Sequence, residues 1–86
     1  MITKSYRQGV FMDYRTIFSE RLLLLRKSAN LSQRALAKEI DLTSPAITYL
    51  ETAKRSPSFE VLCALADFFD VSLDYLVGRS DDPTRN

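Results

Sequence analysis

The sequence predicts an all-α fold of five short helices, and two observations support that prediction. Apolar residues recur every three to four positions in each long segment, which is roughly the period of an amphipathic helix, and no segment alternates apolar and polar residues as a half-buried strand would. A hydroxyl side chain also stands just before each of four of these segments, where it can cap the first turn of a helix: Ser32, Thr43, Ser58 and Ser72.

The first helix is expected to begin near Arg15 or Thr16 and to end at about Ser28. Its inward stripe follows the spacing of one helical face and consists of Phe18, Leu22, Leu25 and Ala29. Leu23 and Leu24 fall outside this stripe, so they need cover from the N-terminal arm, from another helix or from a partner subunit. Burial within the same chain is the simplest of these, and we expect it.

Residues 31–50 hold two short amphipathic helices separated by a break at Asp41-Leu42. The gap is the length of the tight turn in a helix-turn-helix, although an ordinary helical hairpin that buries a core would show the same pattern. Pro45 falls in the first turn of the second helix, where a missing N–H costs little. Asp41 sits where the chain should turn through a left-handed conformation, which aspartate tolerates better than most residues. The inward residues are Leu36, Ala37 and Ile40, then Ala46, Ile47 and Leu50.

The rest of the chain reads as a loop, a longer helix and a short last helix. Residues 52–57 form the loop, and the fourth helix then presents Leu62, Leu65, Ala66 and Phe69 inward. A break at residues 70–72 precedes the final helix, which Gly78 ends. We therefore expect a flexible N-terminal arm over residues 1–14, one folded domain over residues 15–78, and a disordered polar tail over residues 79–86.

Composition argues against several classes of protein. A chain of 86 residues with 45% hydrophobic and 27% charged residues is typical of a single globular domain. With one cysteine and no histidine, the chain lacks the side chains that a zinc site or a Cys/His or Ser/His nucleophile needs, so we expect no enzyme, no metal and no cofactor. No apolar run is long enough to span a membrane and no secretory signal is visible, so we expect a cytoplasmic protein.

The charge is unevenly distributed along the chain, although the net charge is only +1. Residues 26–55 hold six basic and three acidic side chains, whereas residues 56–86 hold two basic and six acidic ones. One end of the molecule is therefore suited to face phosphate groups while the other faces away from them.

Five segments, in this order, carry a resemblance to a known family: Leu-Ser-Gln, Leu-Ala, Ile-x-x-Leu-Glu, Lys-Arg-x-Pro-Ser and Val-Ser-Leu-Asp-x-Leu. Together they resemble the helix-turn-helix domain of the Xre and phage Cro-type repressor family, over about residues 18–78. The resemblance implies a lambda-repressor-like domain whose third helix enters the major groove, usually as a dimer on an inverted repeat. It also implies a structural ion pair between Arg26 and Glu51. The chain departs from the family pattern at Asp41 and Ala53, which replace glycines, and in the short side chains of the third helix.

The outward side of the third helix is the surface that a DNA groove would meet. It lacks Arg, Asn and Gln, so strong paired hydrogen bonds to guanine or adenine are not available from this helix, and DNA shape would supply part of the selectivity. We expect base contacts from Ser44, Pro45, Thr48 and Tyr49. We expect phosphate contacts from Gln33, which matches the family residue with that role, and from Arg34, Thr52, Lys54 and Arg55.

Two functions remain open on these grounds. The leading hypothesis is a sequence-specific double-stranded DNA-binding transcriptional regulator, a repressor that occupies an inverted-repeat operator as a homodimer. The competing hypothesis is a protein-interaction module, or an antitoxin-type partner-binding protein, that keeps the fold without specific DNA binding. Near-neutral charge and the short side chains of the third helix favour the second. The surplus of apolar residues suits either a partner or a dimer: Leu23, Leu24, Phe68 and Tyr75.

Overall fold

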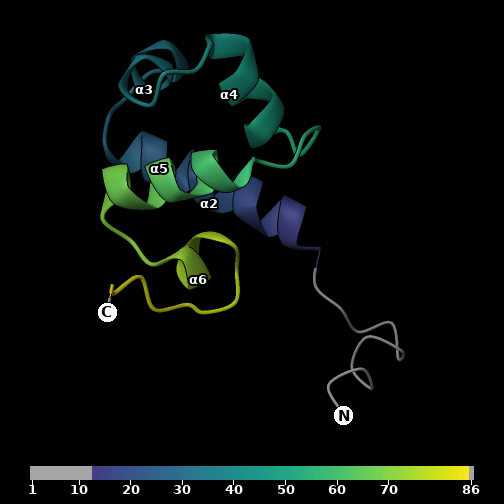
Figure 1. The fold of residues 1–86 in the computed structure, drawn as a ribbon, viewed down its shortest axis with the longest axis vertical. Coiled ribbons are helices and arrows are strands. Elements are labelled where there is room, and N and C mark those ends of the chain that lie inside the picture. Colours follow the sequence, from purple (N-terminus) through teal and green to yellow (C-terminus); the bar gives the residue numbers. More distant parts are fainter. Residues whose placement is uncertain (1–12, 86) are drawn as a thin grey trace.

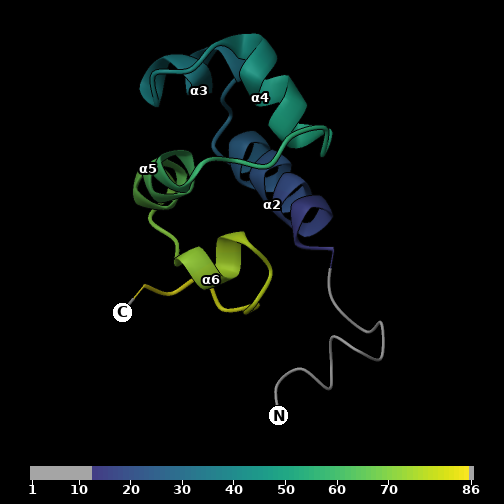
Figure 2. The same cartoon turned by 45° about the vertical axis from the view of Figure 1, so that its right-hand side comes forward.

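The computed structural model describes residues 13–85, which fold into five helices without any strand. The helices are α2 (Tyr14–Ser28), α3 (Gln33–Glu39), α4 (Ser44–Glu51), α5 (Phe59–Phe69) and α6 (Leu73–Leu76). Figures 1 and 2 show α3 and α4 side by side at one end, α2 and α5 across the middle, and α6 with the last residues at the other end. The predicted all-α, five-helix architecture is confirmed.

Every predicted hydroxyl cap is present. The side chains of Ser32, Thr43, Ser58 and Ser72 each accept a hydrogen bond from the backbone N–H three residues on, at distances of 2.9 to 3.2 Å. These bonds satisfy N–H groups that have no partner inside the helix. Helix α2 begins slightly before the predicted start, because the carboxylate of Asp13 caps it by accepting from the N–H of Thr16.

The predicted N-terminal arm lies largely outside the described residues. Within residues 13–85, its last two positions belong to the first helix, as cap and as first residue, and so do not form an arm. None of the described helices combines the length and the apolar character that crossing a membrane requires.

The core is one apolar cluster to which all five helices contribute: Phe18, Leu22, Leu36, Ala37, Ile47, Leu50, Leu65, Ala66 and Leu76. Most of the predicted inward stripes are therefore confirmed. Ala29 is the exception, because α2 ends at Ser28 and Ala29 is an exposed cap residue before a turn. Leu24 is 56% exposed among the described residues, so the expected burial within the chain is wrong for this side chain.

Left-handed residues other than glycine end the first four helices. Asn30, Asp41, Ala53 and Asp70 all have φ between 56° and 60°, and each reverses the chain directly after a helix. The left-handed turn predicted at Asp41 is confirmed. Ala53 differs from the other three because it has no polar side chain to compensate the close approach of its Cβ to the backbone.

Gly78 is required by its backbone and by its neighbour. Its φ is 87°, and a Cβ at this position would lie 2.3 Å from Cγ2 of Ile17 on α2. The glycine therefore lets the end of the α6 region pack directly against the first helix.

The C-terminal segment (residues 79–85) is held against the helices, which differs from the disordered tail expected there. Arg21 on α2 donates to the carbonyl oxygens of Tyr75 and Ser80 at 2.7 and 2.9 Å, and pairs with the carboxylate of Asp81 at 2.7 Å. Its guanidinium also lies 4.1 Å from the centroid of the Tyr75 ring. One arginine on the first helix thus fixes both the last helix and the segment that follows it.

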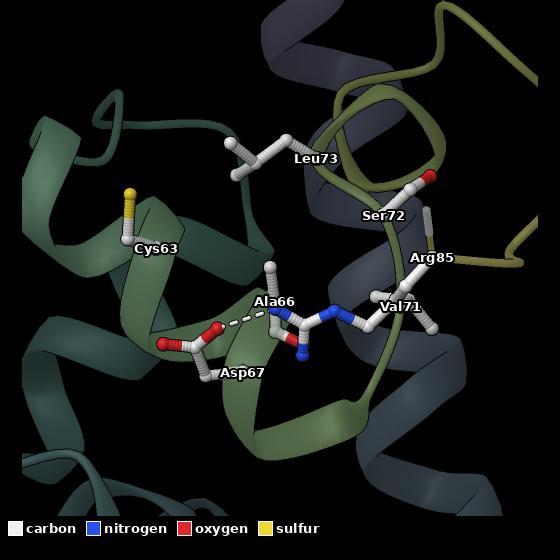
Figure 3. Close-up of a pocket in the computed structure, with 7 residues that line it drawn as sticks. All are labelled: Cys63, Ala66, Asp67, Val71, Ser72, Leu73 and Arg85. Atoms are coloured by element: carbon white, nitrogen blue, oxygen red, sulfur yellow. Dashed lines mark hydrogen bonds and ion pairs between the residues drawn. The ribbon is translucent and has the colours of Figure 1, made fainter.

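A second arginine fixes the far end of the same segment. Arg85 pairs with the carboxylate of Asp67 at 2.7 Å and donates to the carbonyl of Ala66, while the N–H of Ser72 donates to the carbonyl of Pro83 at 3.0 Å. Arg85 thereby forms one wall of a hollow of about 220 Å³ between α5 and α6 (Figure 3). Its other lining residues are Cys63, Ala66, Asp67, Val71, Ser72 and Leu73.

Candidate nucleic-acid interface

Helix α4 is amphipathic, and its inner face anchors it. Ile47 and Leu50 are buried in the core, where α4 packs on both α2 and α3. Ala37 is also buried, and its carbonyl accepts from the N–H of Leu42 at 2.8 Å, which closes the turn between the two helices. The core contacts of the inner face therefore fix the orientation of α4, and the outer face is left without packing.

The four residues predicted to contact bases lie together on that outer face. Ser44, Pro45, Thr48 and Tyr49 line one shallow hollow of about 300 Å³. Pro45 is exposed and the Tyr49 side chain is 40% exposed, whereas Ser44 and Thr48 are half-buried. The hollow presents a ring, a proline and two hydroxyl-bearing side chains to any molecule that docks on α4.

Gln33 connects this surface to the interior. The hydroxyl of Thr48 donates to Oε1 of Gln33 at 2.8 Å, and Nε2 of Gln33 donates to Oε1 of Glu51 at 2.9 Å. Both ends of the amide are thus engaged by the protein, although the sequence predicted a phosphate contact for it. Gln33 thus holds Thr48 in place, a role without a signal in the sequence because its partners lie on another helix. The phosphate contact stays a prediction, since the Gln33 amide nitrogen carries a second N–H.

Beneath Gln33 lies a buried ion pair between α2 and α4. The Nε and Nη2 atoms of Arg26 donate to the two carboxylate oxygens of Glu51, the second at 3.0 Å, and Nη1 donates to the carbonyl of Leu31 at 2.8 Å. The two side chains are only 11% and 4% exposed. The hydrogen bonds that Arg26 donates to Glu51, helped by the negative charge of that carboxylate, raise the pKa of the Arg26 guanidinium.

Arg55 follows α4 in the chain, and its side chain folds back onto that helix. After the left-handed Ala53, the N–H groups of Lys54 and Arg55 both donate to the carbonyl of Tyr49, at 2.9 and 3.3 Å. The Arg55 guanidinium then lies over the Tyr49 ring, 4.7 Å from its centroid. Thr52, in the same turn, donates its hydroxyl proton to the carbonyl of Thr48 at 2.8 Å.

A second hollow, of about 490 Å³, lies beside the first along α3. Arg34 and Lys38 stand on its wall, one helical turn apart and both exposed, and Ser44 belongs to both hollows. Lys38 was not among the predicted contact residues. Its spacing of four from Arg34 was the available signal, since residues so spaced share one face of a helix.

Within residues 13–85, no three acidic or cysteine side chains gather as metal ligands would. Cys63 is half-buried and lines the hollow of Figure 3 together with Asp67, Leu73 and Arg85.

Comparison with known proteins agrees with this arrangement. A helix-turn-helix family model matches residues 22–76. The chain is 39% identical over 67 residues to the HTH-type transcriptional regulator YqaE of Bacillus subtilis (strain 168), across 77% of this chain and 58% of that protein. It is 37% identical over 64 residues to the HTH-type transcriptional activator BcrR of Enterococcus faecalis, across 74% of this chain and 31% of that protein.

The fold also matches a solved repressor. The P22 c2 repressor, determined in complex with a synthetic operator, superposes with a TM-score of 0.70 at 31% identity, over 74% of this chain and 97% of that chain. The chain spans less than two thirds of the two regulators above but almost all of this repressor structure. Because the helix-turn-helix family model covers most of its length, the chain belongs to the Xre/Cro-type helix-turn-helix family of transcriptional regulators.

Proposed function

We propose that this protein binds specific sequences in double-stranded DNA with α4 in the major groove, and that it regulates transcription by occupying an operator. The outer face of α4 is the observation that carries the proposal. Ser44, Pro45, Thr48 and Tyr49 are held there on a rigidly anchored helix with no packing above them. A helix presented in this way matches the dimensions of the major groove. The shared fold of the P22 c2 repressor, solved on operator DNA, supports the same docking.

The distribution of charge supports this orientation. Basic side chains flank the outer face of α4, namely Arg34 and Lys38 beside the start of α4 and Lys54 and Arg55 after its end. Most of the acidic residues lie on α5, α6 and the segments that follow them, and α6 with the last residues forms the end of the molecule opposite α4 (Figure 2). A molecule polarised in this way is steered with its α4 end toward the phosphates of DNA.

The proposed phosphate contacts fall on Arg34 and Lys54, which are exposed. Gln33 and Thr52 contribute less than the sequence suggested, because the Gln33 amide is engaged by Thr48 and Glu51 and the Thr52 proton is given to a backbone carbonyl. These contacts would fix the position of the protein on DNA and carry no sequence information of their own.

Base recognition by α4 itself is proposed to be modest. The single hydroxyl proton of Thr48 is donated to Gln33, so toward DNA this residue offers its methyl group or accepts a hydrogen bond. Pro45 and the Tyr49 ring offer apolar contact to thymine methyl groups. Selectivity would then depend partly on how easily the DNA sequence deforms.

We propose further that the protein acts as a homodimer on an inverted repeat, as a non-enzymatic repressor in the cytoplasm. Exposed apolar side chains on α5 and α6, among them Phe59 at 71% and Leu73 at 41%, offer contacts for a second copy. Helix α6 lies at the end of the molecule opposite α4, so a dimer formed through α6 leaves both recognition helices open. Blocking polymerase by occupying DNA requires nothing beyond a domain of this kind.

Selection of bound duplexes from a randomised DNA pool, at physiological salt, tests the proposal. Enrichment of an inverted repeat with half-sites about one helical turn apart is the expected result. A single enriched half-site would remove the dimer and keep the regulator. Recovery of no sequence above background would refute DNA recognition and favour the protein-interaction module, for which the exposed Leu24 and Phe59 would then be the first candidate contacts.

Variants separate phosphate contacts from general charge effects. The double variant Arg34→Ala/Lys54→Ala should weaken all duplexes alike and reduce the salt dependence of binding by about 0.9 per lost phosphate contact. Arg79→Ala is the matched control for the single variant Arg34→Ala, because each removes one exposed positive charge and Arg79 follows α6, at the end of the molecule opposite α4. An equal effect from the control would show that net charge alone, and no docked surface, governs binding.

A further inference from the structure

We propose that Arg55, held over the ring of Tyr49, recognises a guanine in the major groove through its paired N–H donors. The inference rests on the proposed DNA-binding function and names a base-reading residue that lies outside α4. It replaces the phosphate contact that the sequence suggested for Arg55.

The backbone after α4 brings Arg55 to this position. Ala53 is left-handed, with φ of 60°, and this reversal directs the next two N–H groups onto the carbonyl of Tyr49. Arg55 is therefore anchored to the last turn of α4 and does not extend away from it along the loop. Its side chain runs back over the outer face of the helix, beside the hollow that Tyr49 lines.

The Tyr49 ring restricts the guanidinium without using its donors. The central carbon of the Arg55 guanidinium lies 4.7 Å from the centroid of the ring, a distance at which the cation is attracted to the ring face. Contact with one face leaves the N–H donors at the edge of the planar group available. Within residues 13–85, Arg55 has no salt-bridge partner and its guanidinium donates no hydrogen bond.

Neither the side chains of α4 nor Gln33 beside them are free to make a paired contact with a base. Gln33 has the right chemistry for adenine, but its oxygen accepts from Thr48 and its nitrogen donates to Glu51. The side chains of Ser44 and Thr48 each offer one hydroxyl, which makes single hydrogen bonds. Of the two arginines beside the α4 face, Arg34 and Arg55, it is Arg55 that is held over a ring of α4, and N7 and O6 of guanine are the base acceptors that fit its paired donors.

The location of the stack sets where the guanine should lie. Tyr49 stands in the last turn of α4, whereas Ser44 and Pro45 stand in the first. A guanine read by Arg55 would therefore fall at one end of each half-site, next to the base pair that the Tyr49 ring touches.

The experiment measures affinity for the selected operator and for operators that carry 7-deazaguanine, which lacks the N7 acceptor, at one guanine at a time. For the parent protein, one position in each half-site should lose about 5-fold to 150-fold in affinity, the range for a paired contact. Arg55→Ala removes the paired donors, so it should bind the unmodified operator more weakly and be insensitive to the modification at that position.

Three further variants identify the stack as the cause. Tyr49→Phe retains the aromatic face and should keep the guanine preference, whereas Tyr49→Leu removes the face and should reduce it. Lys54→Ala, next to Arg55 but without a ring contact, should weaken binding at every sequence equally. Thermal unfolding of each variant checks that the fold is intact. We expect this result because Tyr49 and Lys54 are exposed.

The outcomes separate this inference from the proposed function. If the parent selects an inverted repeat but Arg55→Ala retains full sensitivity at every guanine, Arg55 does not read guanine and DNA recognition stands. If the parent protein loses no affinity when any single guanine is modified, Arg55 likewise does not read guanine, and DNA recognition again stands. If the parent selects no sequence at all, the proposed function fails and this inference fails with it.

Discussion

Replacing Arg26 with methionine should remove a large part of the stability of the domain. Methionine fills much of the same space without the charge, so the change isolates the loss of the positive partner. The Glu51 side chain is 4% exposed and receives two hydrogen bonds from Arg26. A carboxylate left alone at such a depth costs about 3–5 kcal/mol.

This magnitude is large for a domain of this size. Domains have about 5–15 kcal/mol of stability in total, and a loss of 1 kcal/mol lowers the Tm of a small domain by about 4–8 °C. The Arg26→Met variant should therefore melt about 12–40 °C below the parent. Thermal and urea unfolding followed by circular dichroism measures both Tm and the free energy of unfolding.

Two controls determine whether burial of the charge is the cause. Lys27→Met removes an exposed positive charge at the adjacent position and should change stability by about 0.5 kcal/mol or less. The double variant Arg26→Met/Glu51→Leu removes both charges and should recover much of the loss. A loss below about 1 kcal/mol in the single variant would show that the pair behaves as a hydrated surface pair, and the reasoning from burial would be refuted.

Three smaller changes test the turns and the first cap. Ala53→Gly relieves a left-handed alanine and should raise the free energy of unfolding by about 0.5–1 kcal/mol, with an unchanged urea m-value; a loss would contradict strain at this site. Gly78→Ala should lower it by about 2 kcal/mol or more, because the new Cβ would collide with Ile17; an unchanged urea midpoint would refute that close approach. The hydrogen bonds from Thr16 lower the pKa of Asp13, so its cap stabilises the domain above the pKa that Asp13 has in the unfolded chain. This contribution should be lost as pH falls through the lowered folded value, and an NMR titration of Asp13 with an ordinary aspartate pKa would contradict it.

The parts of the fold that depend on neighbouring residues could be predicted from the sequence. A cap such as Ser32 or Thr43 acts on an N–H three residues away, so its signal is contained in a short stretch of chain. The same is true of the left-handed turn at Asp41 and of the four residues that share the outer face of α4. Helical geometry alone brings those four together.

Contacts between distant segments could not be predicted in this way. Arg21 meets residues 54 to 60 positions later in the sequence, and composition alone had suggested disorder for part of that region. Gln33 was assigned to phosphate because it matches the family residue with that role, and the sequence does not reveal that Thr48 and Glu51 lie beside its amide. The position of Arg55 over the α4 face follows from one backbone reversal, which a sequence pattern does not resolve.

The C-terminal segment (residues 79–85) gives the molecule a region that opens more easily than its core. Its attachments are hydrogen bonds and ion pairs near solvent, and the Asp81 and Asp67 side chains in them are 99% and 69% exposed. Such bonds weaken as salt rises, whereas the apolar core under α4 does not depend on them. Release of this segment is therefore a local event of low free energy, in which its amide hydrogens exchange and its backbone becomes open to proteases while α2, α3 and α4 stay folded. Ionic strength thus controls the order of one end of the molecule separately from the stability of the other.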